Sequence, residues 1–139
     1  MQHRLRRVAL VAGSLVIAVG LTAVTGAAQA RPDPTALARE RVEAASRVTA
    51  LARTAWKTGT QPVELVYTWS VRWLVAQRDQ KLPAKAWKQA LADHVTRMTE
   101  LEREVAAAVN AGTATPIDRE QASYFRIEAE LWQARGKLP

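Results

Sequence analysis

Apolar residues recur at helical spacings in four segments of the chain, and residues typical of turns separate these segments. This pattern predicts four helices: 34–57, 62–80, Pro83 to Gly112, and Pro116 to Gly136. We therefore expect an all-α protein. Its four helices would form two antiparallel helical hairpins, hairpin one at 34–80 and hairpin two at 83–137.

The segment 62–80 also fits a second pattern. Its odd positions from Val63 to Val75 are all apolar or aromatic, an alternation that is typical of a half-buried strand. Val66, Leu74 and Ala76 fill intervening positions, however, and a strand of this length would be unusually long. We favour a helix, because the matching segment in the second half of the chain is plainly helical.

Two later segments predict how the core is built. The third helix carries a seam with spacings of four and three, at Trp87, Leu91, His94, Met98, Leu101, Val105 and Ala108. In the fourth helix a core face is expected at Ile117, Tyr124, Ile127 and Leu131, flanked by Phe125 and Trp132. Pro83 either separates the second and third helices or kinks one long helix.

The two halves of the chain share a plan at an offset of about 54 residues. Gly-Thr ends the first helix of each half, and Lys-Leu-Pro stands at 81–83 and again at 137–139. A single hairpin cannot cover its own apolar face, whereas two packed together can, so we interpret the chain as a duplicated hairpin. Residues expected to form its turns are Gly59, Pro62, Pro83, Gly112 and Pro116.

This arrangement resembles the helical-hairpin repeat of the periplasmic part of TolC-type outer-membrane efflux proteins. The matching stretches are GTQPVELVY at 59–67, GTATPID at 112–118 and YFRIEAELW at 124–132. The chain is also similar to small exported helical proteins. It has no alternating strand pair with which to build a membrane barrel, so the resemblance implies a hairpin in form and not a complete channel.

The N-terminus has the three parts of a secretory signal peptide. Arg4, Arg6 and Arg7 precede an uncharged run at 8–24, and Ala-Gln-Ala follows at 28–30. We expect cleavage after Ala30, which leaves a helical domain at 31–139 and an exported, periplasmic or envelope-associated protein. The alternative is an uncleaved N-terminal anchor.

Composition narrows the choice of partners. Residues 31–139 carry 17 Lys and Arg against 13 Asp and Glu, a net charge of +4, and the chain has no cysteine. Export argues against nucleic acid, and a weak, salt-screened contact with an anionic membrane or wall surface is the alternative use of the charge. Without disulfides, stability must come from packing.

Few residues suggest chemistry. His94 and Met98 share a helical face and are a weak candidate for a soft metal site, although two side chains do not complete one. A histidine bonded to a neighbouring helix is the simpler interpretation. Ser46, Ser70 and Ser123 lie inside predicted helices without an evident base. We expect no enzyme activity and no cofactor.

Five tryptophans are many for a domain of this size. They either fill the core or form a contact surface, for which we select Tyr67, Trp69, Trp73 and Trp132. The first functional hypothesis is an extracytoplasmic, non-catalytic interaction or structural protein that binds a protein partner or a second copy of itself. The alternative is a periplasmic metal- or stress-responsive protein that uses His94 and Met98.

Overall fold

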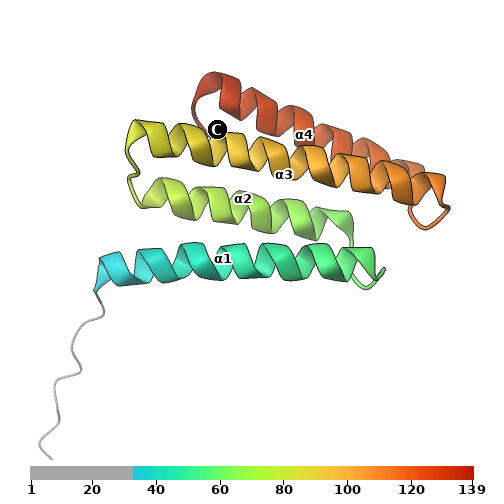
Figure 1. The fold of residues 1–139 in the computed structure, drawn as a ribbon, viewed down its shortest axis with the longest axis horizontal. Coiled ribbons are helices and arrows are strands. Elements are labelled where there is room, and N and C mark those ends of the chain that lie inside the picture. Colours follow the sequence, from blue (N-terminus) through green and yellow to red (C-terminus); the bar gives the residue numbers. More distant parts are fainter. Residues whose placement is uncertain (1–32) are drawn as a thin grey trace, which may run out of the picture. The chain divides into compact units, whose positions relative to one another are not determined.

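The computed structural model describes residues 33–139, and the predicted signal peptide at 1–30 lies outside them. Its helices, in chain order, are α1 (Pro34–Lys57), α2 (Val63–Asp79), α3 (Ala84–Asn110) and α4 (Pro116–Arg135), as Figure 1 shows. Residues 33–139 contain no strand. The all-α prediction is confirmed, and the segment with strand-like alternation is helical.

Four residues, 80–83, keep α2 and α3 apart as separate helices. Lys81 adopts a left-handed backbone with a φ of 53°, which breaks the helical hydrogen-bond pattern. Pro83 then has an extended conformation, with φ −55° and ψ 149°, and α3 begins at the next residue. The chain therefore turns at Pro83, and does not continue as one kinked helix.

The first helix of each pair, α1 and α3, ends in the same turn. Gly59 and Gly112 have φ values of 71° and 72°, which glycine adopts without a steric penalty. In both turns the amide and the hydroxyl of the following threonine donate to the carbonyl of the alanine five residues earlier. The amide bonds are 2.9 Å long and complete a Schellman motif at each end.

A proline stands at the start of each of the four helices, and Pro34 lies in the first turn of α1. Pro62 and Pro83 occupy the N-cap positions of α2 and α3, one residue before the first turn in which we expected them. Pro116 lies in the first turn of α4, and the Thr115 side chain accepts a hydrogen bond from the backbone N–H of Asp118. The Asp118 carboxylate accepts from the Thr115 N–H in return, which completes a capping box.

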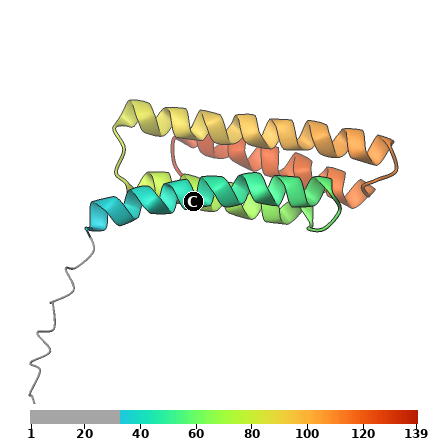
Figure 2. The same cartoon turned by 60° about the horizontal axis from the view of Figure 1, so that its bottom comes forward.

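Helix α2 is the central element of the packing. It contacts α1, α3 and α4, and α3 also packs along α4 (Figures 1 and 2). By contrast, no Cα atom of α1 comes within 8 Å of a Cα atom of α3. Helix α1 is thus held mainly by α2, and long side chains span the distance to α3.

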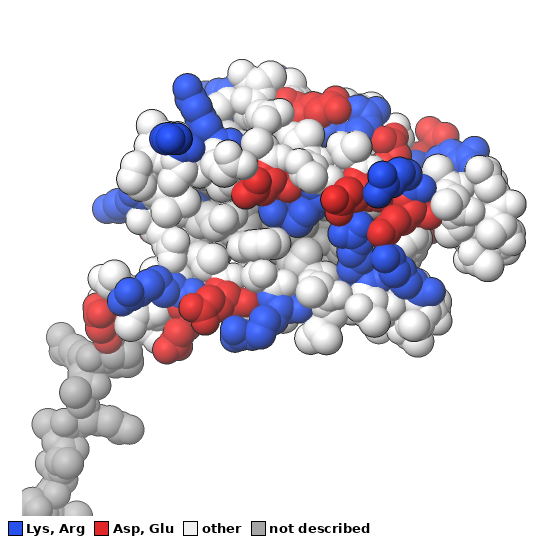
Figure 3. All heavy atoms as spheres, in the orientation of Figure 1, with Lys and Arg blue, Asp and Glu red and all other residues white. Residues whose placement is uncertain are grey.

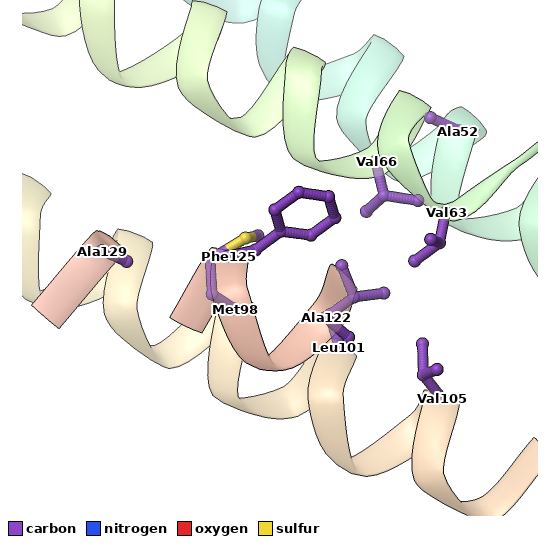
Figure 4. Packing of buried hydrophobic residues seen from close by; sticks show 9 residues of the cluster. All are labelled: Ala52, Val63, Val66, Met98, Leu101, Val105, Ala122, Phe125 and Ala129. Carbon is purple, nitrogen blue, oxygen red and sulfur yellow. The ribbon is translucent and has the colours of Figure 1, made fainter. Parts of the chain in front are cut away.

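Two clusters form the core. The larger one lies among all four helices and contains small and branched side chains around one phenylalanine (Figure 4), namely Ala52, Val63, Val66, Met98, Leu101, Val105, Ala122, Phe125 and Ala129. The smaller one contains Leu74, Ala90, Leu91, Trp132 and Leu138. Leu138 belongs to the C-terminal tail of the chain. The Trp87 Nε1–H holds this tail by donating to the Gly136 carbonyl at 2.9 Å.

The predicted core face of α4 was wrong. The side chains we placed inside are exposed by 66, 60, 54 and 43% at Ile117, Tyr124, Ile127 and Leu131. The buried side of the helix instead carries two alanines between the large residues, in the set Ala122, Phe125, Ala129 and Trp132. Alanines allow close approach to α2 and α3, so this side packs more tightly than the one with the larger aliphatic residues.

Among residues 33–139, no helix combines the length and the apolar character that crossing a bilayer requires.

Candidate functional site

A polar network is buried between α2 and α3. Ser70 and His94 both have 0% exposure. The Ser70 Oγ lies 3.0 Å from the His94 Nδ1 and accepts a hydrogen bond of 2.9 Å from the Arg97 Nε. The guanidinium also lies over the Trp73 ring, with its Cζ 4.1 Å from the ring centroid. These contacts join four residues that are up to 27 positions apart.

The imidazole in this network is held neutral. Burial is the main cause, and the positive charge of Arg97 adds to it, so the pKa of His94 falls to about 3. Its Nε2 atom has no hydrogen-bond partner within the described residues. Although Ser70 contacts a histidine, its hydroxyl is enclosed and already accepts from Arg97, so no substrate can reach it in this conformation.

The structure places the two candidate metal ligands in the interior. His94 is 0% and Met98 1% exposed, and both belong to the α3 seam that faces α2 and α4. No group of three or more His, Cys, Asp or Glu that could hold a metal ion occurs in the described part of the chain.

A groove runs between α1 and α3, with α2 beneath it. One part has a volume of about 330 Å³, and we call it the α1–α3 groove; it is lined by Ser46, Thr49, Ala50, Arg53, Thr54, Lys57, Trp73 and Arg97. A second part of about 510 Å³ lies nearer the two Schellman turns and shares Lys57 with the first. The groove exists because α1 and α3 are not in close backbone contact.

Ion pairs bridge this groove. The Arg53 guanidinium donates to both carboxylate oxygens of Glu104, at 2.8 and 3.0 Å, and to Glu100 at 3.1 Å. The Lys57 ammonium lies 2.9 Å from the same Glu104. Burial disfavours the charged form of Glu104, but hydrogen bonds from the two cations outweigh it and lower the pKa of this carboxyl.

Two of the four predicted contact aromatics, Tyr67 and Trp69, pack against the larger core cluster. Tyr67 stacks on Phe125 with ring centroids 4.1 Å apart, and its hydroxyl donates to Glu128. Burial, together with that carboxylate, raises the pKa of Tyr67. Trp69 is half-buried against the larger core cluster, and Arg72 covers its ring. Each ring thus has partners inside its own chain.

The other two aromatics belong to the buried network. Arg97 covers Trp73, and the Trp73 Nε1–H is buried without a partner among residues 33–139. Trp132 is only 6% exposed and stacks on His94 at 5.7 Å between ring centroids. Trp132 therefore offers no surface to a partner in this fold. A partner can reach Trp73 only through the α1–α3 groove.

The largest exposed apolar feature lies on the outer side of α4. We call it the α4 stripe; it consists of Ile117, Tyr124, Ile127 and Leu131. Their spacings of seven, three and four place them on one side of the helix. This side adjoins the buried one, since the Tyr124 ring lies edge-on to Phe125 with centroids 6.3 Å apart. The sequence pattern assigns all four side chains to the core. It identifies an apolar side of the helix correctly, but this side is not the buried one.

Sequence reasoning also missed Arg97. A single arginine on a charged helix carries no signal of its own, and its role depends on Ser70 and Trp73 from another helix. Ser70 and Trp73 are three residues apart and lie on one side of α2, so they could have marked a polar point in an apolar segment. Only the packing shows which residue contacts them.

Charge on the visible surface is mixed. Figure 3 shows Lys and Arg interspersed with Asp and Glu on this face, without a broad patch of one sign. A mixed surface fits a generic solvated exterior better than a surface that follows a polyanion.

Comparisons with protein-family models, with curated proteins and with solved structures found no match for this chain.

Proposed function

We propose that this is an exported, non-catalytic helical interaction protein that pairs with a second copy of itself through the α4 stripe. One observation carries the proposal: four large apolar side chains are 43 to 66% exposed on one side of a single helix. Contiguous exposed apolar surface on a folded chain marks an interaction site more often than a solvated face.

The stripe has the dimensions of a helix contact. Ile117 and Leu131 are 14 residues apart, about 21 Å along the helix axis at 1.5 Å per residue. Tyr124 and Ile127 lie between them. Aromatic and branched residues at these spacings are typical anchors of helix–helix interfaces.

The charges beside the stripe favour a second copy as the partner. Glu120 stands near the N-terminal end of the same side of α4, and Arg135 near its C-terminal end. Both are exposed, and neither forms a salt bridge within the described residues. In an antiparallel pair centred beside Ile127, each Glu120 lies opposite the other copy's Arg135, and each Tyr124 lies opposite a Leu131.

The proposal retains the duplicated hairpin as the form of the domain. Its support is the contact of α1 with α2 and of α3 with α4, together with the two matching Gly-Thr turns. Export and the likeness to TolC-type hairpins rest on the sequence features alone, and the proposal includes them on that ground.

The test is the mass of the domain at 31–139, without the predicted signal peptide, by analytical ultracentrifugation over a range of concentrations. We expect a monomer–dimer equilibrium for the wild type. Ile127→Ser should shift it to monomer, whereas Leu51→Ser, at a residue 68% exposed on α1, should leave it unchanged. A wild-type chain that stays monomeric at hundreds of micromolar would overturn self-association and leave a different protein as the partner to seek.

Charge exchange sharpens the test. Glu120→Arg alone or Arg135→Glu alone places like charges opposite each other twice per dimer, so we expect about tenfold weaker association. The double variant with both changes should restore wild-type affinity, because the pairs re-form with exchanged signs. If the double variant dimerises as poorly as the single ones, the antiparallel arrangement is wrong.

A further inference from the structure

Arg97 is a partly buried charge without a salt-bridge partner in the described part of the chain. Its guanidinium makes one hydrogen bond, from Nε to the Ser70 hydroxyl, and its Nη2 atom is buried without a partner. It forms no salt bridge within 4.0 Å among residues 33–139; Asp93, one turn earlier, is exposed and accepts from Gln89. Enclosing a guanidinium without a carboxylate is costly, so such a site favours an anion from outside.

The surroundings of Arg97 leave a positive charge unopposed. Arg53 and Lys57 approach from α1, and Glu100 and Glu104 from α3. The two carboxylates pair with the two α1 cations, so the charge of Arg97 remains as the excess. Burial lowers the pKa of Arg97 to about 10, against the opposing effect of Asp93, and the group is still charged at neutral pH.

The α1–α3 groove gives this charge an accessible pocket. Its volume of about 330 Å³ exceeds that of one water molecule by roughly an order of magnitude. Trp73 lies beneath Arg97 and holds a second N–H donor without a partner. The facing wall from α1 carries the hydroxyls of Ser46, Thr49 and Thr54. The Thr49 and Thr54 hydroxyls donate to backbone carbonyls of α1. Arg97 and the Ser46 hydroxyl therefore remain as donors along this small space.

We propose that the α1–α3 groove binds a small oxyanion, a carboxylate or a phosphate, through Arg97. The guanidinium supplies the charge-assisted hydrogen bonds, because its planar donors match two oxygens of such a group. The Ser46 hydroxyl supplies a neutral donor. This site is independent of association through the α4 stripe, since none of its residues belongs to α4.

The experiment is a titration of the full chain with sodium phosphate and, separately, sodium acetate at pH 7 and constant ionic strength. Binding is followed through the NMR signals of the tryptophan indole N–H groups. We expect a saturable shift confined to the Trp73 signal. The anion that saturates at the lower concentration identifies the preferred chemistry, and sodium chloride at the same ionic strength is the reference.

Two variants remove the site in different ways. Arg97→Met removes the charge and keeps a chain of similar length, and we expect about tenfold or greater weakening of binding. Ala50→Phe leaves Arg97 in place and fills the groove from its exposed rim, with the same expected result. Arg47→Met removes an α1 arginine outside the groove, and its binding should equal that of the wild type.

The two variants test anion binding in the α1–α3 groove independently, so one of them is sufficient if the other folds poorly. A shift that Ala50→Phe abolishes and Arg47→Met preserves supports the pocket. Equal shifts in the wild type, Arg97→Met and Ala50→Phe, or a response to chloride as strong as that to phosphate and acetate, would overturn it.

Discussion

Folded proteins usually place apolar side chains inside and polar ones outside. Two regions of this molecule depart from that rule in opposite ways: the network around Arg97 and the outer side of α4. The first places a guanidinium, an imidazole and a hydroxyl inside the bundle. The second places four large apolar side chains in contact with water. Scattered exposed leucines need no explanation, whereas a buried polar cluster and an exposed apolar stripe do.

The difference between the two regions lies in scale and chemistry. The network opens on a groove of about 330 Å³ with polar donors, which suits a small charged molecule. The α4 stripe extends for about 21 Å on a convex helix, which suits another helix. Both regions leave groups unsatisfied in the single chain, and each indicates the kind of partner that would satisfy them.

The largest expected effect separates the two sides of α4. Phe125→Ala should lower the free energy of unfolding by about 3–5 kcal/mol, because it opens a cavity beside Tyr67 in the larger core cluster. Ile127→Ala, two residues later, should change it by no more than about 0.5 kcal/mol at concentrations where the chain is monomeric. Urea denaturation of both variants gives the comparison. Similar losses would mean that the stripe is not exposed in solution.

The next largest effect is the pH dependence of the unfolding free energy that arises from the buried His94 imidazole. The pKa of His94 is lowered to about 3 in the folded chain, below the unfolded value of about 6.5, so unfolding takes up a proton between these values. Stability is therefore complete above the unfolded pKa and is lost as the pH falls. The loss should be about 2 kcal/mol between pH 7 and pH 5, a range above the ordinary titration of carboxylates.

His94→Gln tests the origin of this loss. Glutamine can still bond to Ser70 but does not titrate, so the unfolding free energy of the variant should be nearly flat from pH 7 to pH 5. Chemical denaturation at several pH values provides the measurement. An equally steep pH dependence in the variant would assign the effect to other groups.

The smallest effect concerns the ion pairs that span the groove. Arg53→Met should cost about 1 kcal/mol, because bidentate bonds to Glu104 are lost at a partly exposed site. The cost should shrink in 1 M salt. Arg47→Met is the control, since its pair with Glu43 is exposed at 3.7 Å and should contribute almost nothing. Equal costs for the two variants would show that α1 does not depend on this bridge.

Local signals in the sequence were enough to find the helices. The i, i+3, i+4 spacing of α3 marked Leu91, His94, Met98 and Leu101, and all four are buried. Gly112 and Pro116 marked a helix end and a helix start, because left-handed turns and first-turn prolines need only neighbouring residues. Such interactions are complete within a few residues, so a single sequence contains them.

The buried side of α4 could not be read in this way. The helix has two apolar sides, and the one with Ile127 has the larger aliphatic residues. The side with Phe125 is the buried one, because Ala122 and Ala129 leave room for α2 and α3 to approach. Amphipathicity cannot choose between two apolar sides, since the choice depends on the shape of the helices that pack there.

What the sequence alone determined, then, is the set of helices and their ends. The tertiary structure decided which side of α4 is exposed, and it brought Arg97 onto Trp73 and Ser70 from 24 and 27 residues away. The physical reason is range: capping and helical periodicity act within one or two turns of the chain. Close packing and the pairing of buried polar groups depend on which distant surfaces meet.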